Sequence, residues 1–180
     1  RAHTAKINEA ADLRGVSTGL GIQLFGQSNL QQAFDLVDAG RTPAERAEEL
    51  GPRLDLVTGL GFDVLSLSFG EFFGAEPADF VAAVTETYDA IQARQPGTEV
   101  PVTLHVGDDL RVTWEGRDLL YYFLALEVDR PLTPWVHTVM FYGLYGDAGG
   151  AYGHDDFNEH RDLLLQRLRD RQPVGHHPES

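Results

Sequence analysis

Residues 62–69, Phe-Asp-Val-Leu-Ser-Leu-Ser-Phe, form a short apolar run of the kind that builds a buried β-strand. A helical pattern follows this run, because Phe80, Val84 and Ile91 recur at helical spacing. A second apolar run, residues 100–106, comes next. Strands that alternate with helices are typical of parallel α/β proteins, since two parallel strands need a long crossover between them.

The same alternation extends in both directions along the chain. Apolar runs at residues 21–26, 135–142 and 174–177 complete five strand and helix cycles. The strand ends at Gly70, Val106, Tyr142 and Pro178 are about 36 residues apart, a length that fits βα units joined by right-handed crossovers. This regular spacing predicts one continuous parallel sheet.

Three helices between these runs have different sequence patterns. One is expected from Thr42 to about residue 57, because Thr42, Pro43 and Glu45 form the pattern of a capping box with proline in the first turn. Residues 118–128 are predicted to be a strongly apolar helix. Residues 157–168 carry an apolar stripe at helical spacing.

The absence of nucleotide-binding motifs narrows the fold class. No Gly-x-Gly-x-x-Gly follows the first apolar run and no Walker-type loop occurs, so a doubly wound nucleotide-binding fold loses its main support. We therefore predict an α/β protein of parallel βα repeats in which residues 16–180 form part of a TIM (β/α)8 barrel, apparently truncated at the C-terminus after five units. Residues 1–15 are either a leader or a helix of a preceding unit.

Composition excludes several classes of function. The chain of 180 residues has a formal charge of −14, which disfavours nucleic acid as a partner, and it has no cysteine, which excludes thiolate catalysis and disulfides. No apolar run approaches the length needed to span a bilayer, so membrane insertion is not expected. We expect a soluble protein, either cytoplasmic or secreted, that acts on a small molecule or saccharide.

Polar and aromatic residues cluster where the predicted strands end. In a parallel barrel these strand ends and the loops after them build the active site. The candidates in chain order are Glu71, His105, Asp108, Trp114, Trp135, Tyr142, His177 and Glu179. Paired carboxylates among aromatic rings suit acid/base chemistry on a sugar, because a ring can raise the pKa of one carboxyl while the other stays ionised.

Glu71 and Glu179 stand at the ends of the second and fifth predicted strands, three strands apart. In this respect the chain resembles barrel glycoside hydrolases, which carry the acid on strand four and the nucleophile on strand seven. The resemblance implies that Glu71 is the general acid/base and Glu179 the nucleophile. The residue before Glu71 is Gly70, where many such enzymes have an asparagine that binds the sugar 2-hydroxyl.

The other candidates take supporting roles in this interpretation. Trp114, Trp135 and Tyr142 would help to form a sugar platform, while His105, Asp108 and His177 would bind and orient the substrate. No cofactor is needed for this chemistry. A strand histidine such as His137 is expected to be a hydrogen-bonded core residue instead.

Two alternatives remain open at the level of the sequence. His105, Asp108, His177 and Glu179 could ligate a divalent metal in a metal-dependent hydrolase or isomerase, although no His-x-His or His-Glu-x-x-His motif supports this. The chain could also be a non-catalytic binding protein on a barrel-like scaffold, because a fold does not define a function.

Overall fold

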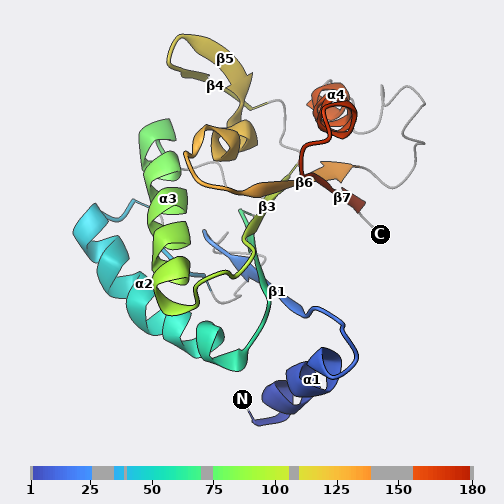
Figure 1. The fold of residues 1–180 in the computed structure, drawn as a ribbon. Helices are drawn as coiled ribbons and strands as arrows, with labels where there is room; N and C mark the ends of the chain where they lie inside the picture. Colours follow the sequence, from blue (N-terminus) through green and yellow to red (C-terminus); the bar gives the residue numbers. More distant parts are fainter. Residues whose placement is uncertain are drawn as a thin grey trace.

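A computed structural model describes residues 2–25, 35–38, 40–69, 75–105, 110–138 and 156–178 of the chain (Figure 1). Its helices are α1 (Ala2–Asp12), α2 (Pro43–Val57), α3 (Pro77–Arg94) and α4 (Asp156–Arg169), with short 3-10 helices η1 (Thr58–Leu60) and η2 (Tyr121–Glu127). Its strands are β1 (Gly19–Gln23), β2 (Val64–Ser68), β3 (Pro101–Leu104), β4 (Arg111–Trp114), β5 (Arg117–Leu120), β6 (Thr133–Thr138) and β7 (Gly175–Pro178).

Five of these strands form one sheet in the order β1-β2-β3-β6-β7, and every neighbouring pair is parallel. This confirms the prediction of a parallel α/β protein with five strands. The order follows the chain without reversing, unlike the order of a doubly wound sheet, which reverses at its switch point. The positions of strands β1, β2, β3, β6 and β7 agree with the five predicted apolar runs.

Helix α2 begins where its sequence pattern predicts. The Glu45 amide donates to the Thr42 hydroxyl at 3.4 Å, and the Thr42 amide donates to the Glu45 carboxylate at 2.8 Å, so the capping box is complete. The helix ends at Val57, and η1 leads to Gly61, which has a left-handed φ of 76°. A tight turn of this kind favours glycine because a Cβ would be strained there.

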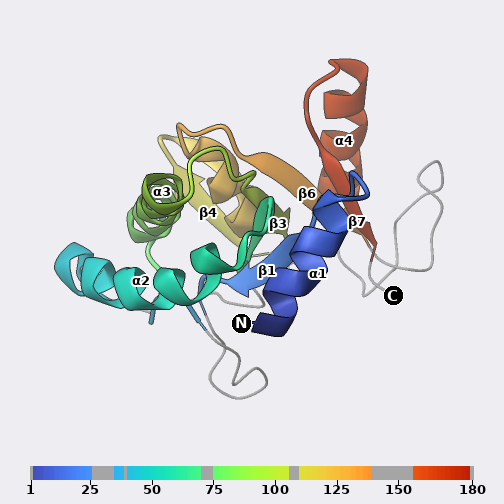
Figure 2. The ribbon, with the colours of Figure 1, turned by 60° about the horizontal axis from the view of Figure 1, so that its bottom comes forward.

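Helices α2 and α3 lie side by side on one side of the sheet, and α4 lies at its other end beside β6 and β7 (Figure 2). An ion pair joins α2 and α3, because the Arg46 guanidinium makes two hydrogen bonds to the Glu86 carboxylate, at 2.8 and 2.9 Å. Arg46 is buried, and its remaining hydrogen bond goes to the Arg41 carbonyl. A buried charge needs such partners, since it has lost its water.

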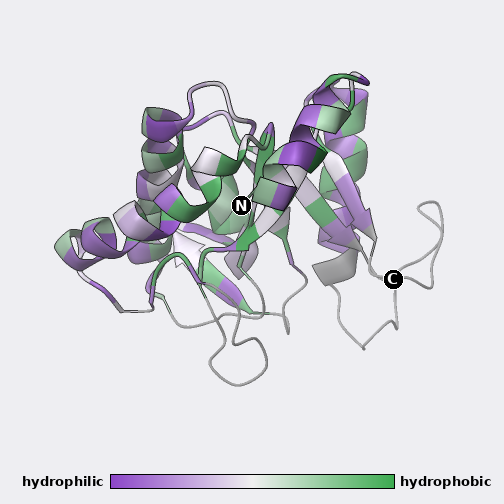
Figure 3. Cartoon of the chain, turned by 90° about the horizontal axis from the view of Figure 1, so that it is seen from below, coloured by the Kyte–Doolittle hydropathy of each residue, from purple (hydrophilic) through white to green (hydrophobic). Residues whose placement is uncertain are grey.

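The hydrophobic core lies between the sheet and these helices. Alternate strand residues point into it, and the sheet contributes the fully buried side chains Leu65, Leu67, Val102, Leu104 and Val136. Helices α2 and α3 contribute Leu54, Phe80, Val84 and Ile91. Figure 3 shows that the helices carry both hydrophilic and hydrophobic residues, as expected of helices with only one face in a core.

The predicted helix at residues 118–128 is wrong. Residues 111–120 form the antiparallel β4–β5 hairpin, and only residues 121–127 are helical, as the 3-10 helix η2. The turn residues Glu115 and Gly116 both have positive φ, 48° and 77°, which is the geometry of a tight two-residue hairpin turn. This hairpin is an excursion from the connection between β3 and β6, so the parallel sheet is not interrupted.

Most apolar residues of segment 118–128 are nevertheless buried, while Phe123 and Leu126 are half-buried. Tyr121 and Tyr122 lie in the core, and the Tyr121 hydroxyl donates to the Ala75 carbonyl at 2.9 Å. Burial raises the pKa of Tyr121 to about 12, so this phenol stays protonated and remains a donor.

The N-terminal segment forms helix α1 over Ala2–Asp12. It docks on η1 through the Asn8 side-chain amide, which donates to the Leu60 carbonyl at 2.7 Å. Within the described parts of the chain, no helix is both long and apolar enough to cross a membrane.

Candidate functional site

The sheet face opposite the core holds the main candidate site. Because strand side chains alternate, the neighbours of the core residues point to this face, and they are mostly small, polar or aromatic. They line an open pocket of about 540 Å³ that crosses all five strands. Its lining residues are Gly19, Leu20, Gly21, Val64, Ser66, Ser68, Thr103, His105, Trp135, His137 and His177.

The polar residues of this pocket gather toward the carboxyl ends of the strands. Ser68 is the last residue of β2, His105 directly follows β3, and His137 and His177 each precede the last residue of their strands. All five strands are parallel, so these ends meet at the same edge of the sheet. This edge is where parallel α/β enzymes place their reactive groups.

Three histidines form a row across neighbouring strands. The rings of His105 and His137 are stacked, with centroids 4.6 Å apart and planes at 17°, and His137 pairs in register with His177, whose ring centroid is 5.9 Å away. Trp135 lies beside this row, with its ring centroid 6.5 Å from that of His177. The result is a continuous aromatic surface along one wall of the pocket.

His137 is uncharged at neutral pH. Burial is the main cause that lowers the pKa of His137 to about 3, and the neighbouring imidazoles of His105, His177 and His160 contribute to this shift because like charges repel. A neutral imidazole offers one hydrogen-bond donor and one acceptor. His137 was expected to be a core residue, and it is indeed buried, but it also lines the pocket.

The histidine row does not have the geometry of a metal site. Nitrogen lone pairs lie in the ring plane, so two stacked and nearly parallel rings cannot both aim at one ion about 2 Å away. In the described part of the chain, no group of three or more His, Asp or Glu side chains is placed to hold a metal ion. The metal alternative also requires Asp108 and Glu179, which lie outside the described residues.

A histidine behind the pocket supports its wall from the core side. His160, on α4, is fully buried, and its Nε2 is 3.2 Å from the His105 carbonyl oxygen. Since a carbonyl can only accept, Nε2 carries the proton in this contact. His160 also packs against the Phe123 ring, with centroids 5.0 Å apart, so α4 and η2 together hold the end of β3 in place.

Sequence reasoning had overlooked His160. It lies four residues before Leu164, the buried leucine of α4, and therefore on the apolar side of that helix. The sequence did contain a signal for this role. His160 is a polar residue at a position where the helical period calls for an apolar one. Ser66, Ser68 and Thr103 were also missed, because only the register of the sheet shows that they face the same pocket as the histidines.

The structure brings three of the predicted site residues together and places one, Trp114, elsewhere. His105, Trp135 and His177 line the same pocket. Trp114 lies on the β4–β5 hairpin, packs against the core, and is not among the residues that line the pocket. The predictions for Glu71, Asp108, Tyr142 and Glu179 fall outside the described residues.

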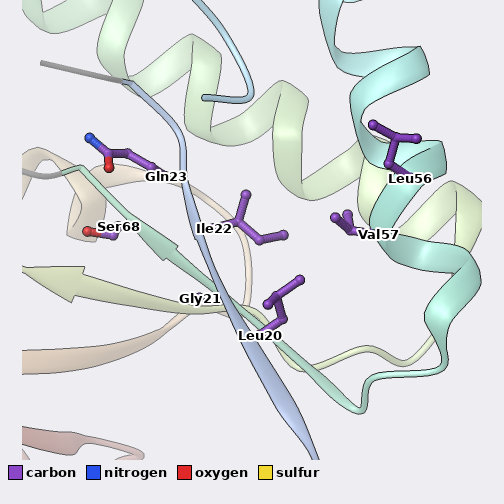
Figure 4. A pocket seen from close by; sticks show the side chains of 7 residues that line it. All are labelled: Leu20, Gly21, Ile22, Gln23, Leu56, Val57 and Ser68. Atoms are coloured by element: carbon purple, nitrogen blue, oxygen red, sulfur yellow. The ribbon is translucent and has the colours of Figure 1, made fainter. Parts of the chain in front are cut away.

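A second pocket, of about 490 Å³, lies beside β1 and has a different character (Figure 4). Leu20 and Ile22 of β1 lie near Leu56 and Val57 of α2, while Gln23 and Ser68 stand at its other end. None of the described residues that line it has a titratable side chain, and the strongest nucleophile among them is a serine hydroxyl. We therefore do not assign the chemistry to it.

Comparison with known proteins returned no match to a family model, to a curated protein or to a solved structure.

Proposed function

We propose that this chain is part of a (β/α) barrel enzyme that binds and hydrolyses a saccharide in the pocket containing Trp135 and the histidine row. The observation that carries the proposal is the composition of this pocket. One large aromatic ring and several uncharged hydrogen-bonding groups face the same space, which is the combination that sugars require. Aromatic rings pack on the apolar face of a pyranose, and hydroxyl and imidazole groups bond its hydroxyls.

The catalytic part of the proposal rests on the two glutamates and on the resemblance to barrel glycoside hydrolases. Glu179 directly follows β7, and Glu71 comes three residues after the end of β2, so both follow strands that border the pocket. Glu71 would protonate the leaving oxygen, and Glu179 would attack the anomeric carbon. His105 and His177 would orient the sugar, with Tyr142 and Asp108 as further contacts.

Hydrolysis of 4-nitrophenyl glucosides, galactosides, mannosides and xylosides tests this proposal. We expect turnover of at least one of them, and we expect Glu71→Gln and Glu179→Gln each to lower kcat/KM by at least about 100-fold, since each carboxylate takes part in bond breaking. Glu115→Gln, at the tip of the β4–β5 hairpin, is the matched control and should keep full activity. Binding without hydrolysis would instead identify a binding protein, and loss of activity with a chelator would favour the metal enzyme.

The barrel part of the proposal is supported by the strand order and by the edge of β1. The Thr18 carbonyl accepts a hydrogen bond from the Val64 amide, and the Leu24 amide donates one to the Ser68 carbonyl, so the backbone groups of both residues point toward β2. Because backbone groups alternate in direction along a strand, the Gly21 amide points toward the opposite edge of β1. Among the described residues, only segment 35–37 meets that edge, and it pairs with the end of β1 beyond Gly21. The apolar pocket of Figure 4 lies beside this open stretch, where a further strand and helix would pack.

Hydrogen exchange tests barrel closure directly. If another strand pairs with β1, the Gly21 amide is bonded and should exchange as slowly as the Leu65 amide, which donates within the sheet to the Glu99 carbonyl at 2.9 Å. Exchange of Gly21 at the rate of an unprotected amide, with Leu65 protected, would show an open sheet edge.

A further inference from the structure

Gly175 and Trp135 are paired residues on neighbouring strands, and the glycine makes room for the indole. They are in register between β7 and β6. A Cβ on residue 175 would lie 2.3 Å from Trp135 Cδ1, 2.7 Å from Nε1 and 2.9 Å from Cγ. These atoms belong to the five-membered part of the indole, so Trp135 lies across the Gly175 backbone.

This contact determines the direction in which the indole points. Side chains on a sheet normally stand away from it, and a side chain at position 175 would force Trp135 to do the same. Without one, the indole rests flat against β7, and Trp135, which is only partly buried, presents its other face to the pocket. The ring plane is tilted by 34° from that of His177, the next residue of β7 on this face.

The part of the pocket lining that the structure describes contains no arginine or lysine. The titratable groups among these described lining residues are three histidines, of which His137 is neutral. Glu71 and Glu179, the catalytic residues of the proposed function, would add negative charge and no cation. A ligand with a carboxylate or phosphate group would therefore meet no arginine or lysine among the lining residues, and it would lose its water without compensation.

From these observations we infer that Gly175 is a positioning residue that holds Trp135 flat as a stacking platform for an uncharged sugar ring. The inference depends on the saccharide function proposed above and specifies its ligand class. It assigns the discrimination between neutral and anionic sugars to the lack of arginine and lysine in the described lining, and the affinity for the ring face to the Gly175 and Trp135 pair.

The first test uses tryptophan fluorescence to detect a change in the position of the Trp135 indole in the absence of sugar. The chain has two tryptophans, so Trp114→Phe leaves Trp135 as the only one. In that background we expect Gly175→Ala to change the emission maximum and the acrylamide quenching of Trp135. Gly59→Ala, where an added Cβ meets nothing within 4 Å, is the matched control and should change neither. Identical spectra for Gly175→Ala and its parent would overturn the inference.

A double-mutant cycle keeps the test decisive if Gly175→Ala folds poorly. Trp135→Ala removes the atoms that the new methyl group would meet, so the thermal destabilisation caused by Gly175→Ala should largely disappear in the Trp135→Ala background. An equal loss of Tm in both backgrounds would mean that the two residues are not coupled, and the inference would fail.

The second test uses sugars. Cellobiose, maltose, mannobiose and xylobiose are the neutral probes, and digalacturonate and glucose 6-phosphate are the anionic ones. We expect at least one neutral probe to shift Trp135 emission, and we expect Gly175→Ala to weaken its binding at least tenfold. Tighter binding of an anionic probe, or equal binding by wild type and Gly175→Ala, would overturn the inference while the saccharide function stands. If no sugar binds although the indole moves in Gly175→Ala, the proposed function itself fails.

Discussion

The two faces of the parallel sheet are made from alternate residues of the same strands and have opposite properties. Toward the helices the strands present aliphatic side chains such as Leu67 and Val102, which are fully buried. Toward the pocket they present serine, threonine, histidine, tryptophan and glycine. Because the side-chain period of a strand is two, residues that are adjacent in sequence separate packing from ligand binding.

Burial of a side chain also has a different effect on stability on each face. On the helix face a buried side chain is apolar and contributes transfer and packing energy. On the pocket face Ser66, Thr103 and His137 are each less than a tenth exposed, yet they are polar. Burial of polar groups lowers stability unless they are hydrogen-bonded, so this face is the one shaped by requirements other than stability.

The largest expected effect compares two neighbours on β2. Leu67→Ala should lower the free energy of unfolding by about 3 kcal/mol, because it removes a fully buried side chain and leaves a cavity. Ser66→Ala, on the pocket face, is the matched control and should cost less than about 1 kcal/mol. Urea denaturation of both variants measures the difference, and equal losses would show that the two faces are equally important for packing.

A smaller effect, dependent on pH, should come from His137. The unfolded chain takes up a proton at this residue below pH 6.5, whereas the folded protein does not until about pH 3, so the folded state loses stability as the pH falls through this window. The loss should be about 2 kcal/mol at pH 5. Unfolding of wild type and His137→Gln at pH 7 and pH 5 measures it.

Wild type and His137→Gln share every other titrating group, so the difference between their pH dependences isolates the contribution of His137. The drop in stability from pH 7 to pH 5 should be smaller in His137→Gln than in wild type. The same drop in both proteins would mean that His137 is not held neutral by the pocket.

The smallest expected effect comes from substituting His160, the α4 residue that contacts the His105 backbone from the helix side of the sheet. His160→Leu removes the donor to the His105 carbonyl at similar volume, and it should cost about 1 to 2 kcal/mol, since a buried acceptor loses its partner. His160→Gln keeps a donor and should recover part of this loss. If leucine is tolerated as well as histidine, the contact does not support the end of β3.

Local patterns in the sequence were sufficient for much of the fold. The capping box at Thr42, the helical period of α3 and the β-type runs all act over a few residues, and each was found where predicted. The segment after β3 was not predicted correctly. Its apolar residues Leu119 to Leu126 have no clear period, so a helix, a strand or a 3-10 helix could each bury them.

The turn at Glu115-Gly116 shows why this segment misled the prediction. Both residues adopt positive φ, which asparagine or aspartate followed by glycine would have signalled clearly, but glutamate does not. Gly116 was therefore a weak indication of a hairpin. The hairpin is also held from outside the local sequence, since Arg111 pairs with Glu159 of α4 at 2.5 Å.

The candidate site was predicted only in part for a related reason. That His105 and His177 lie at strand ends follows from the sequence, and the structure places both in one pocket. That Trp114 lies on a hairpin, that His160 supports β3, and that Gly175 makes room for Trp135 all depend on contacts between distant segments.

By itself the sequence determined the number of main strands, their parallel arrangement and the start of helix α2, because these follow from periodicity and short-range hydrogen bonds. The tertiary structure alone decided which side chains share a pocket and which glycine an indole can cover. A register shift of one residue would turn Trp135 and the histidines into the core, and the register is set by the packing of the whole sheet.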